Sequence, residues 1–229
     1  MSCMKFFACV FLLTICGCAA VKTVPLVFTP GSQIDTLSTA VSISIHNSAG
    51  STGGHGYLIY RRPDQFHLVM LSPFGSTMLE AFALGDRLTL VYTSQKTAYT
   101  GSFDELADTS GMQEWRLLRW VMDADPSKQA GFNGSINRSI AQGGWETVTY
   151  ESGLVTVKST PAGDRVFYRD YVAFNGVPLP SELEIFNSRS DRIQLKLEEP
   201  EVNVALDATV FTPRLDEIKV YPLSALPVQ

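Results

Sequence analysis

Few side chains in this 229-residue sequence could perform covalent chemistry. The candidates are three histidines, His46, His55 and His67, and four cysteines. The Gly-x-Ser-x-Gly motif of a nucleophile elbow is absent, and no His and Cys residues have the spacing of a zinc site once the N-terminal segment is removed. A triad of His55 with an Asp and a Ser elsewhere can be imagined, but no motif supports it. We therefore expect no enzyme, no cofactor and no metal site.

The chemistry that the cysteines do indicate is lipidation of Cys18. Lys5 precedes an apolar run over residues 6–15, which is too short to span a bilayer and is typical of a secretory signal peptide. The run ends in Ile15-Cys16-Gly17-Cys18, which resembles a bacterial lipobox. Lipoprotein signal peptidase would cut before Cys18, and the thiol would carry a diacylglyceryl group. The alternative is an ordinary signal peptide with chance cysteines. All four cysteines lie at or before Cys18, so a disulfide framework is excluded.

The residue after Cys18 indicates where the protein would reside. Lipoproteins that stay in the inner membrane tend to carry Asp there, whereas this sequence has Ala19. We expect a protein anchored by its N-terminal lipid to the inner leaflet of the outer membrane and facing the periplasm. Residues 1–17 would be the signal peptide, 18–31 the lipidated N-terminus and tether, and 32–229 one folded domain, whose size suits a single core.

Charge argues against two classes of partner. Lys5 is the only charged residue of the signal segment, and without it the chain holds 17 basic and 23 acidic side chains. The charges are mixed along the chain and no basic run occurs, so nucleic acid is not an expected partner. The acidic balance also disfavours electrostatic binding of anionic lipid headgroups. We expect a monomer.

A second stretch with unusual chemistry is "LSPFGSTMLE", residues 71–80. Pro73 and Gly75 are turn residues, since one restricts φ and the other tolerates a positive φ. Phe74 stands between them, and leaving a Phe exposed forfeits about 1.5–3 kcal/mol of burial. Either Phe74 folds back onto the sheet edge, or something outside the chain receives it.

Alternation of apolar and polar residues dominates the remaining pattern and predicts a mainly β fold. Turn signals such as Ser152-Gly153 and short spacings between the strands indicate antiparallel neighbours. The Gly-rich stretch 50–56 is not followed by a helical pattern, and we expect a hairpin loop there. About ten or eleven strands are expected, over residues 39–47, 55–62, 65–72, 76–84, 87–92, 97–100, 146–158, 165–175, 182–185, 192–198 and 201–207.

Helical signals are confined to two or three short segments. Ser102 and Glu105 have the spacing of a capping box that would open a short helix. A second helix is expected over "QEWRLLRWVMDA" (113–124), where Trp115, Leu118 and Met122 share one face. A third short helix is expected at about 32–38. Each strand has one apolar face, which predicts a curved sheet around an interior, with helices across the opening.

Three segments together resemble the LolA/LolB superfamily of lipoprotein carriers and receptors, and most closely the LolB family of outer-membrane lipoprotein receptors. They are "LVMLSPFGSTMLEA" (68–81), "LLRWVMDADP" (117–126) and "GVPLPSELEIFNSRSDRIQLKLEEPEVN" (176–203), and the match spans about residues 40–205. The resemblance implies an unclosed antiparallel half-barrel whose helices form a lid over a hydrophobic cavity. Two departures stand out: Phe74 occupies a turn position that is typically Leu in the family, and an extension follows from about residue 206.

The resemblance also implies a function and a site. A LolB-like protein accepts acylated lipoproteins from a LolA-like periplasmic carrier and inserts them into the outer membrane, with Pro73, Phe74 and Gly75 as its membrane-insertion loop. Two alternatives remain open: a lipoprotein of the same fold that binds another lipid or hydrophobic ligand, and an assembly lipoprotein with a solid interior. Plain core packing would give the same apolar pattern. The residues expected to line an acyl-chain cavity are Phe66, Leu68, Met70, Met78, Phe82, Leu90, Trp115, Leu118, Met122, Leu183 and Ile185.

Overall fold

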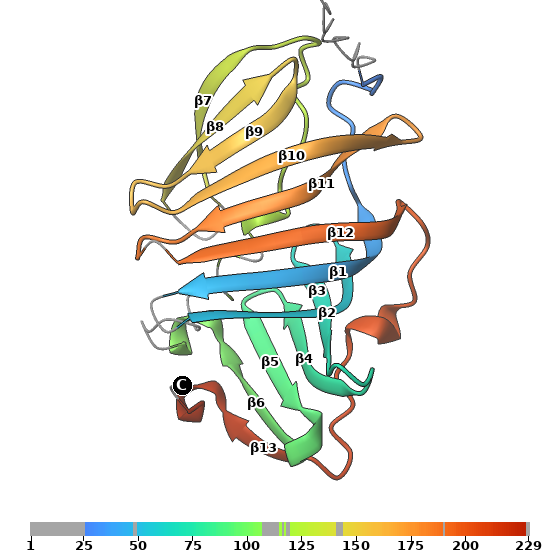
Figure 1. Cartoon of the computed structure of the whole chain (residues 1–229), viewed down its shortest axis with the longest axis vertical. Coiled ribbons are helices and arrows are strands. Elements are labelled where there is room, and N and C mark those ends of the chain that lie inside the picture. The colour runs from blue at the N-terminus through green and yellow to red at the C-terminus, as the bar shows by residue number, and fades with distance from the viewer. Residues whose placement is uncertain are drawn as a thin grey trace, which may run out of the picture.

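The structure, a computed structural model, is built on one large β-sheet (Figure 1). It describes residues 26–47, 50–106, 115, 117, 120–140, 144–189 and 191–227. The predicted signal peptide, Cys18 and Leu118 lie outside these residues, so the predictions made for them concern parts that the structure does not describe.

The described residues form 13 strands and four short 3-10 helices. The strands are β1 (Thr36–Asn47), β2 (Gly50–Arg61), β3 (Gln65–Leu71), β4 (Thr77–Leu84), β5 (Arg87–Tyr92), β6 (Thr97–Ser102), β7 (Gly134–Ser139), β8 (Trp145–Glu151), β9 (Leu154–Ser159), β10 (Arg165–Phe174), β11 (Val177–Phe186), β12 (Arg192–Val202) and β13 (Lys219–Pro222). The 3-10 helices are η1 (Thr93–Gln95), η2 (Phe103–Glu105), η3 (Ala208–Phe211) and η4 (Leu223–Ala225). Trp115, Leu117, Trp120 and Val121 are α-helical.

The strands form a single unclosed sheet in the order β13-β6-β5-β4-β3-β2-β1-β12-β11-β10-β9-β8-β7. Two antiparallel meanders, β2 to β6 and β7 to β12, are joined by β1, which pairs with both β2 and β12. The sheet twists strongly along this order, so that β3 to β6 run steeply where β10 to β12 run across the view (Figure 1). Among the strands that the structure describes, only β13 and β6 pair in parallel.

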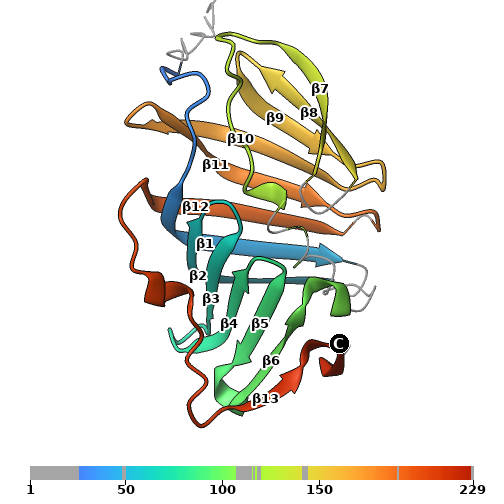
Figure 2. The same ribbon diagram turned by 180° about the vertical axis from the view of Figure 1, so that it is seen from behind.

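Alternation places most large apolar side chains on one face, which we call the inner face. The main core lies there and includes Leu37 on β1, Leu58 on β2, Leu90 on β5 and Leu195 on β12. Seen from behind, the short helical segment near residue 120 lies in front of the sheet (Figure 2). Its Val121 is fully buried in the same core. The segment therefore covers the inner face between the two meanders.

A second, smaller cluster lies on the opposite, outer face. It contains Phe82, Val91 and Ala98 from β4, β5 and β6, covered by Leu215 and Ile218 of the C-terminal extension. The extension then adds β13 to the edge strand β6 and buries Leu223 in the main core. The C-terminal segment is thus an integral part of the fold.

The mainly β prediction is confirmed, with several corrections to individual elements. The Gly-rich stretch 50–56 is the first half of β2 and not a loop, because it pairs with β1 along its whole length. No helix forms at 32–38, since β1 already begins at Thr36. Strand β12 continues to Val202, and residues 203–207 are not strand. Strands β7 and β13 were not predicted, because neither alternates clearly.

Two of the helical predictions have a counterpart in the structure. Ser102 and Glu105 form the expected capping box, which opens the single 3-10 turn η2. The described positions of the segment predicted at 113–124 are helical from Trp115 to Val121.

Candidate functional site

An apolar cavity opens on the inner face, where β1 meets its neighbouring strands. Its volume is about 240 Å³, and nine of its ten described lining residues are apolar. They are Ile43, Ile45, Leu68, Met70, Leu79, Trp115, Ile185, Ile193 and Leu195, with Asn47 as the polar exception. The residues come from both meanders and from the helical segment, so the cavity exists only because β1 joins the two halves of the sheet.

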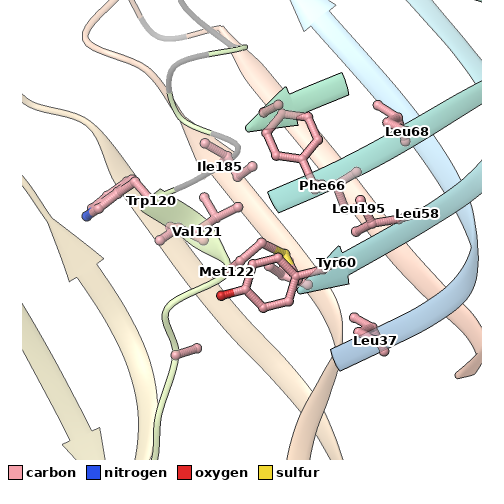
Figure 3. Close-up of a cluster of buried hydrophobic side chains, with 14 of the residues drawn as sticks. Leu37, Leu58, Tyr60, Phe66, Leu68, Trp120, Val121, Met122, Ile185 and Leu195 are labelled. Carbon is pink, nitrogen blue, oxygen red and sulfur yellow. The ribbon is translucent and has the colours of Figure 1, made fainter. Parts of the chain in front are cut away.

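The helical segment that contributes Trp115 ends in a closely packed cluster. Trp120, Val121 and Met122 are all buried and lie with Ile185 and Leu195 in the main core (Figure 3). The indole nitrogen of Trp120 points away from this cluster in Figure 3. Apolar contacts therefore hold one side of the segment against the sheet, and polar contacts are made on the other side.

Those polar contacts form a buried network around Lys158 on β9. Lys158 is fully buried, and its Nζ donates hydrogen bonds to the carbonyl oxygens of Trp120 (2.7 Å) and Asp123 (3.0 Å). The Nζ also lies 3.3 Å from Oε2 of Glu146, which is 3% exposed. A lysine that donates to the last carbonyls of a helix stabilises that end of the helix. The network thus attaches the end of the segment to the β8–β9 hairpin.

Glu146 is the shared acceptor of this network. Its carboxylate accepts hydrogen bonds from Trp120 Nε1 (2.5 Å) and Arg138 Nε (2.5 Å). Arg138 also pairs with Asp123 at 2.8 Å. Burial lowers the pKa of Lys158 to about 8, while the carboxylates of Glu146 and Asp123 act in the opposite direction. The network is structural, since it positions the segment that carries Trp115 and does not line the cavity.

Phe74 lies at the tip of the turn between β3 and β4 and is 98% exposed. The turn is well ordered by its own hydrogen bonds: Gly75 N donates to Ser72 O at 2.9 Å, and Ser72 N donates to Ser76 O at 2.8 Å. Gly75 has φ +82°, a conformation that side chains rarely adopt. The alternative in which Phe74 folds back onto the sheet edge is therefore wrong. A rigid turn holds the ring in solvent.

The eleven residues that the resemblance suggested for the cavity fall into different parts of the structure. Leu68, Met70, Trp115 and Ile185 line it. Phe66, Leu90, Met122 and Leu183 are buried in the core on the same face without lining the cavity. Leu118 lies outside the described residues.

Two of those residues were assigned to the wrong face. Phe82 belongs to the outer cluster, and Met78, which shares its parity on β4, is 51% exposed. The inward positions of β4 are Leu79, Ala81 and Ala83, which belong to the main core or pack against it. Phe82 faces outward and is nevertheless buried, because the C-terminal extension covers it there.

Several cavity residues were not predicted. Ile43 and Ile45 sit on β1, and Ile193 and Leu195 on β12, where alternation correctly indicated a strand with one apolar face. That pattern cannot distinguish a cavity wall from solid packing. The Lys158 network was not predicted either. Lys158 has the parity of the inward residues of β9 and pairs with Val148 and Val166, but a single lysine in a strand does not by itself indicate burial.

The histidines do not form a catalytic arrangement. Ser42 Oγ lies 2.9 Å from His55 Nδ1 and donates to Glu198 Oε1 at 3.3 Å, so the serine stands between the base and the carboxylate. A catalytic triad requires the histidine in that middle position. His67 pairs with Glu80 at 2.9 Å on the outer face.

Within the described ranges, no group of His, Cys, Asp and Glu side chains could hold a metal ion. No described helix has the length and apolar character needed to cross a membrane.

Comparison with known proteins identifies the family. The sequence profile of the family "Outer membrane lipoprotein LolB" matches residues 36–199. The chain therefore belongs to the LolB family, which confirms the resemblance seen in the sequence. A comparison with curated proteins finds no significant match.

Solved structures share the fold at low sequence identity. One is a DUF1329 family protein from Desulfovibrio piger, with 10% identity and a TM-score of 0.59, covering 78% of this chain and 90% of that one. Another is a putative outer membrane lipoprotein-sorting protein domain from Vibrio parahaemolyticus, with 9% identity and a TM-score of 0.54, covering 77% and 89%. At these identities the likeness concerns the fold alone.

Proposed function

We propose that this chain is an outer-membrane lipoprotein, anchored through Cys18 on the periplasmic side, that accepts acylated lipoproteins from a LolA-like carrier and inserts them into the outer membrane. The observation that carries the proposal is the apolar cavity of about 240 Å³ on the inner face of a LolB-family chain. Membership of that family and the likeness of the fold to a putative outer membrane lipoprotein-sorting protein domain support the same class of cargo. The proposed activity breaks and forms no covalent bond.

The cavity suits part of an acyl chain for physical reasons. Its apolar wall would remove methylene groups from water, at about 0.8 kcal/mol for each buried CH₂. Its volume of about 240 Å³ lies below the range of roughly 300–1,000 Å³ typical of sites for drug-sized ligands. A segment of one chain therefore fits better than a whole triacylated group. Met70 would be an adaptable part of the wall. The segment that carries Trp115 would act as the lid.

Phe74 would supply the contact with the target membrane. The ring is 98% exposed, and the hydrogen-bonded turn keeps it away from the sheet. A rigid aromatic tip can enter the acyl boundary of a bilayer without any rearrangement of the fold. Because Cys18 would already anchor the protein, the turn is needed only to orient the protein for release of cargo.

One alternative is a lipoprotein of the same fold that binds a different hydrophobic ligand. An apolar wall with Asn47 as its single described polar residue recognises apolar chains in general, so the cavity alone does not select a lipoprotein. Native mass spectrometry after mild extraction separates the two cases. An acylated protein bound to the chain supports the proposed function, whereas a free lipid supports the alternative.

The decisive experiment is depletion of the protein in its own cell. Other lipoproteins should then accumulate in the periplasm in complex with a soluble carrier, because the acceptor is missing. Restoring the wild-type gene should clear them. Normal arrival of lipoproteins at the outer membrane in depleted cells would overturn the proposal.

A matched pair of variants tests whether the cavity is the binding site. Ile45 lines the cavity, and the adjacent His46 is exposed on the other side of β1. In the full chain carrying Cys18→Ala, Ile45→Phe should weaken binding of a fluorescent fatty acid at least tenfold by filling the cavity, and His46→Phe should not. Equal effects of the two substitutions would place the binding site elsewhere.

A further inference from the structure

Strand β2 crosses the floor of the cavity without contributing a described lining residue. The cavity is lined by Ile43 and Ile45 from β1 and by Leu68 and Met70 from β3, and β2 lies between these two strands. Opposite these lining residues, the inward positions of β2 are Thr52 beside Ile45, Gly54 beside Ile43 and Gly56 beside Met70. Gly54 and Gly56 have no side chain, so the floor of the cavity is backbone at these two positions.

The two inward glycines differ in what a side chain would meet. A Cβ on Gly56 would lie 1.8 Å from the carbonyl oxygen of Val69, so the close approach of β2 and β3 requires glycine there. A Cβ on Gly54 would meet only one atom within 4 Å, the terminal Cε of Met70, at 2.9 Å. Gly54 also has an ordinary φ for an L-residue. The backbone thus tolerates a side chain at position 54, and only a flexible methyl group opposes it.

Gly54 therefore forms a notch in the cavity floor, and the end of Met70 occupies it. Met70 is a lining residue of the cavity, and methionine adapts to irregular space because its side chain is unbranched. While the methyl group lies in the notch, the rest of the cavity is free. Any group added at Gly54 must push that methyl group toward the cavity.

We propose that Gly54 and Met70 together determine the length of the acyl chain that the cavity accepts. The inference rests on the proposed function, because it assumes that an acyl chain is the ligand. Gly54 provides the space, and Met70 is the movable part of the wall that uses it. The pair is a specificity determinant within the apolar wall.

The test measures binding of saturated fatty acids of increasing length to the full chain carrying Cys18→Ala. For the wild-type cavity, affinity should rise roughly fourfold per added methylene, the factor that corresponds to about 0.8 kcal/mol, until the cavity is full. Met70→Ala removes about three methylene-sized atoms, so the plateau should move to chains about two to three carbons longer. Gly54→Ala displaces Met70, so the plateau should move to chains about one to two carbons shorter.

Two controls make the result specific. Met78→Ala removes the same side chain from the outer face of β4 and should leave the plateau where it is. In the Met70→Ala background, Gly54→Ala should have little further effect, because the atom it displaces is gone. Circular dichroism checks folding, and Met70→Ala tests the same wall if Gly54→Ala does not fold.

The outcomes separate this inference from the proposed function. Wild-type binding with a plateau that neither substitution moves would overturn the role of Gly54 and Met70 alone. An equal shift caused by Met78→Ala would also overturn it. No fatty-acid binding by the wild-type chain would overturn the proposed function and this inference with it.

Discussion

Replacing Phe74 by Ala should leave the fold intact and weaken contact with a membrane. The ring is 98% exposed, and the hydrogen bonds that order the turn come from Ser72, Gly75 and Ser76 and not from the Phe74 side chain. Surface substitutions of this kind change the free energy of unfolding by no more than about 0.5 kcal/mol. Thermal unfolding of the variant should therefore match that of the wild type.

The loss of membrane contact can be estimated from the exposed ring. Transfer of a whole Phe side chain from water to an apolar environment contributes about 1.5–3 kcal/mol. If the tip enters the acyl boundary of the bilayer, Phe74→Ala should lower partitioning onto vesicles roughly 10- to 150-fold, and Phe74→Leu should retain most of it. Phe74→Glu should also slow transfer of an acylated fluorescent peptide to the vesicles, while binding of the peptide to the protein stays unchanged.

The assay uses the full chain carrying Cys18→Ala, so that the lipid anchor does not mask the turn. Zwitterionic phosphatidylcholine vesicles avoid repulsion from the acidic protein. Leu84→Ala is the control, because Leu84 is 54% exposed at the opposite end of β4. Equal partitioning of the Phe74 and Leu84 variants would refute the reasoning, since exposure alone would then explain the data. Unfolding of Phe74→Glu would show that the ring belongs to the core.

Three further predictions concern the anchor, the buried network and the extension. Cys18→Ala should release a folded, soluble protein, which mass spectrometry would show without N-terminal acyl chains; retention in the membrane would contradict lipidation at Cys18. Lys158→Met should destabilise the fold by about 1–3 kcal/mol, because the carbonyl oxygens of Trp120 and Asp123 lose this donor while Glu146 keeps Trp120 and Arg138. Burial lowers the pKa of Lys158 from 10.5 to about 8, so between these pH values the unfolded state binds more protons than the folded state. The stability of the wild type relative to Lys158→Met should therefore rise from pH 8 toward 10. A difference in the free energy of unfolding that stays constant over this range in chemical denaturation would contradict this. Removal of residues 207–229 should lower the denaturation midpoint, because it uncovers Phe82 and removes Leu223 from the core; an unchanged midpoint would contradict the integral role of the extension.

The sequence predicted the local features that depend on neighbouring residues. The turn at Pro73 and Gly75 follows from the restricted φ of one residue and the conformational freedom of the other. The capping box of Ser102 and Glu105 likewise involves groups only three residues apart. Alternation located strands such as β5 over Arg87–Tyr92, because successive side chains of a strand point to opposite faces. Family membership could be inferred as well, since the order of three segments along the chain is itself sequence information.

Only the tertiary structure decided which face of each strand packs on the main core and which face points outward. Alternation on β4 distinguishes the set of Phe82 and Met78 from the set of Leu79 and Ala81, but it does not indicate which set faces inward. The C-terminal extension decides this by covering Phe82 from a position more than a hundred residues later in the chain. Lys158 is likewise typical of a surface residue in sequence, and only the fold brings the carbonyls of Trp120 and Asp123 and the carboxylate of Glu146 to it.

The cavity is a further feature whose apolar residues the sequence indicates but whose existence only the tertiary structure decides. Apolar residues on β1, β3 and β12 predict burial, and burial is equally consistent with solid packing. The Gly-rich stretch 50–56 resembles a loop in sequence because glycine has a low strand propensity. Pairing with β1 makes it a strand, and the missing side chain at Gly54 then leaves a notch beside Met70. The sequence pattern thus indicates which residues of the wall are apolar. Whether a cavity remains between them depends on contacts between strands that are distant in sequence.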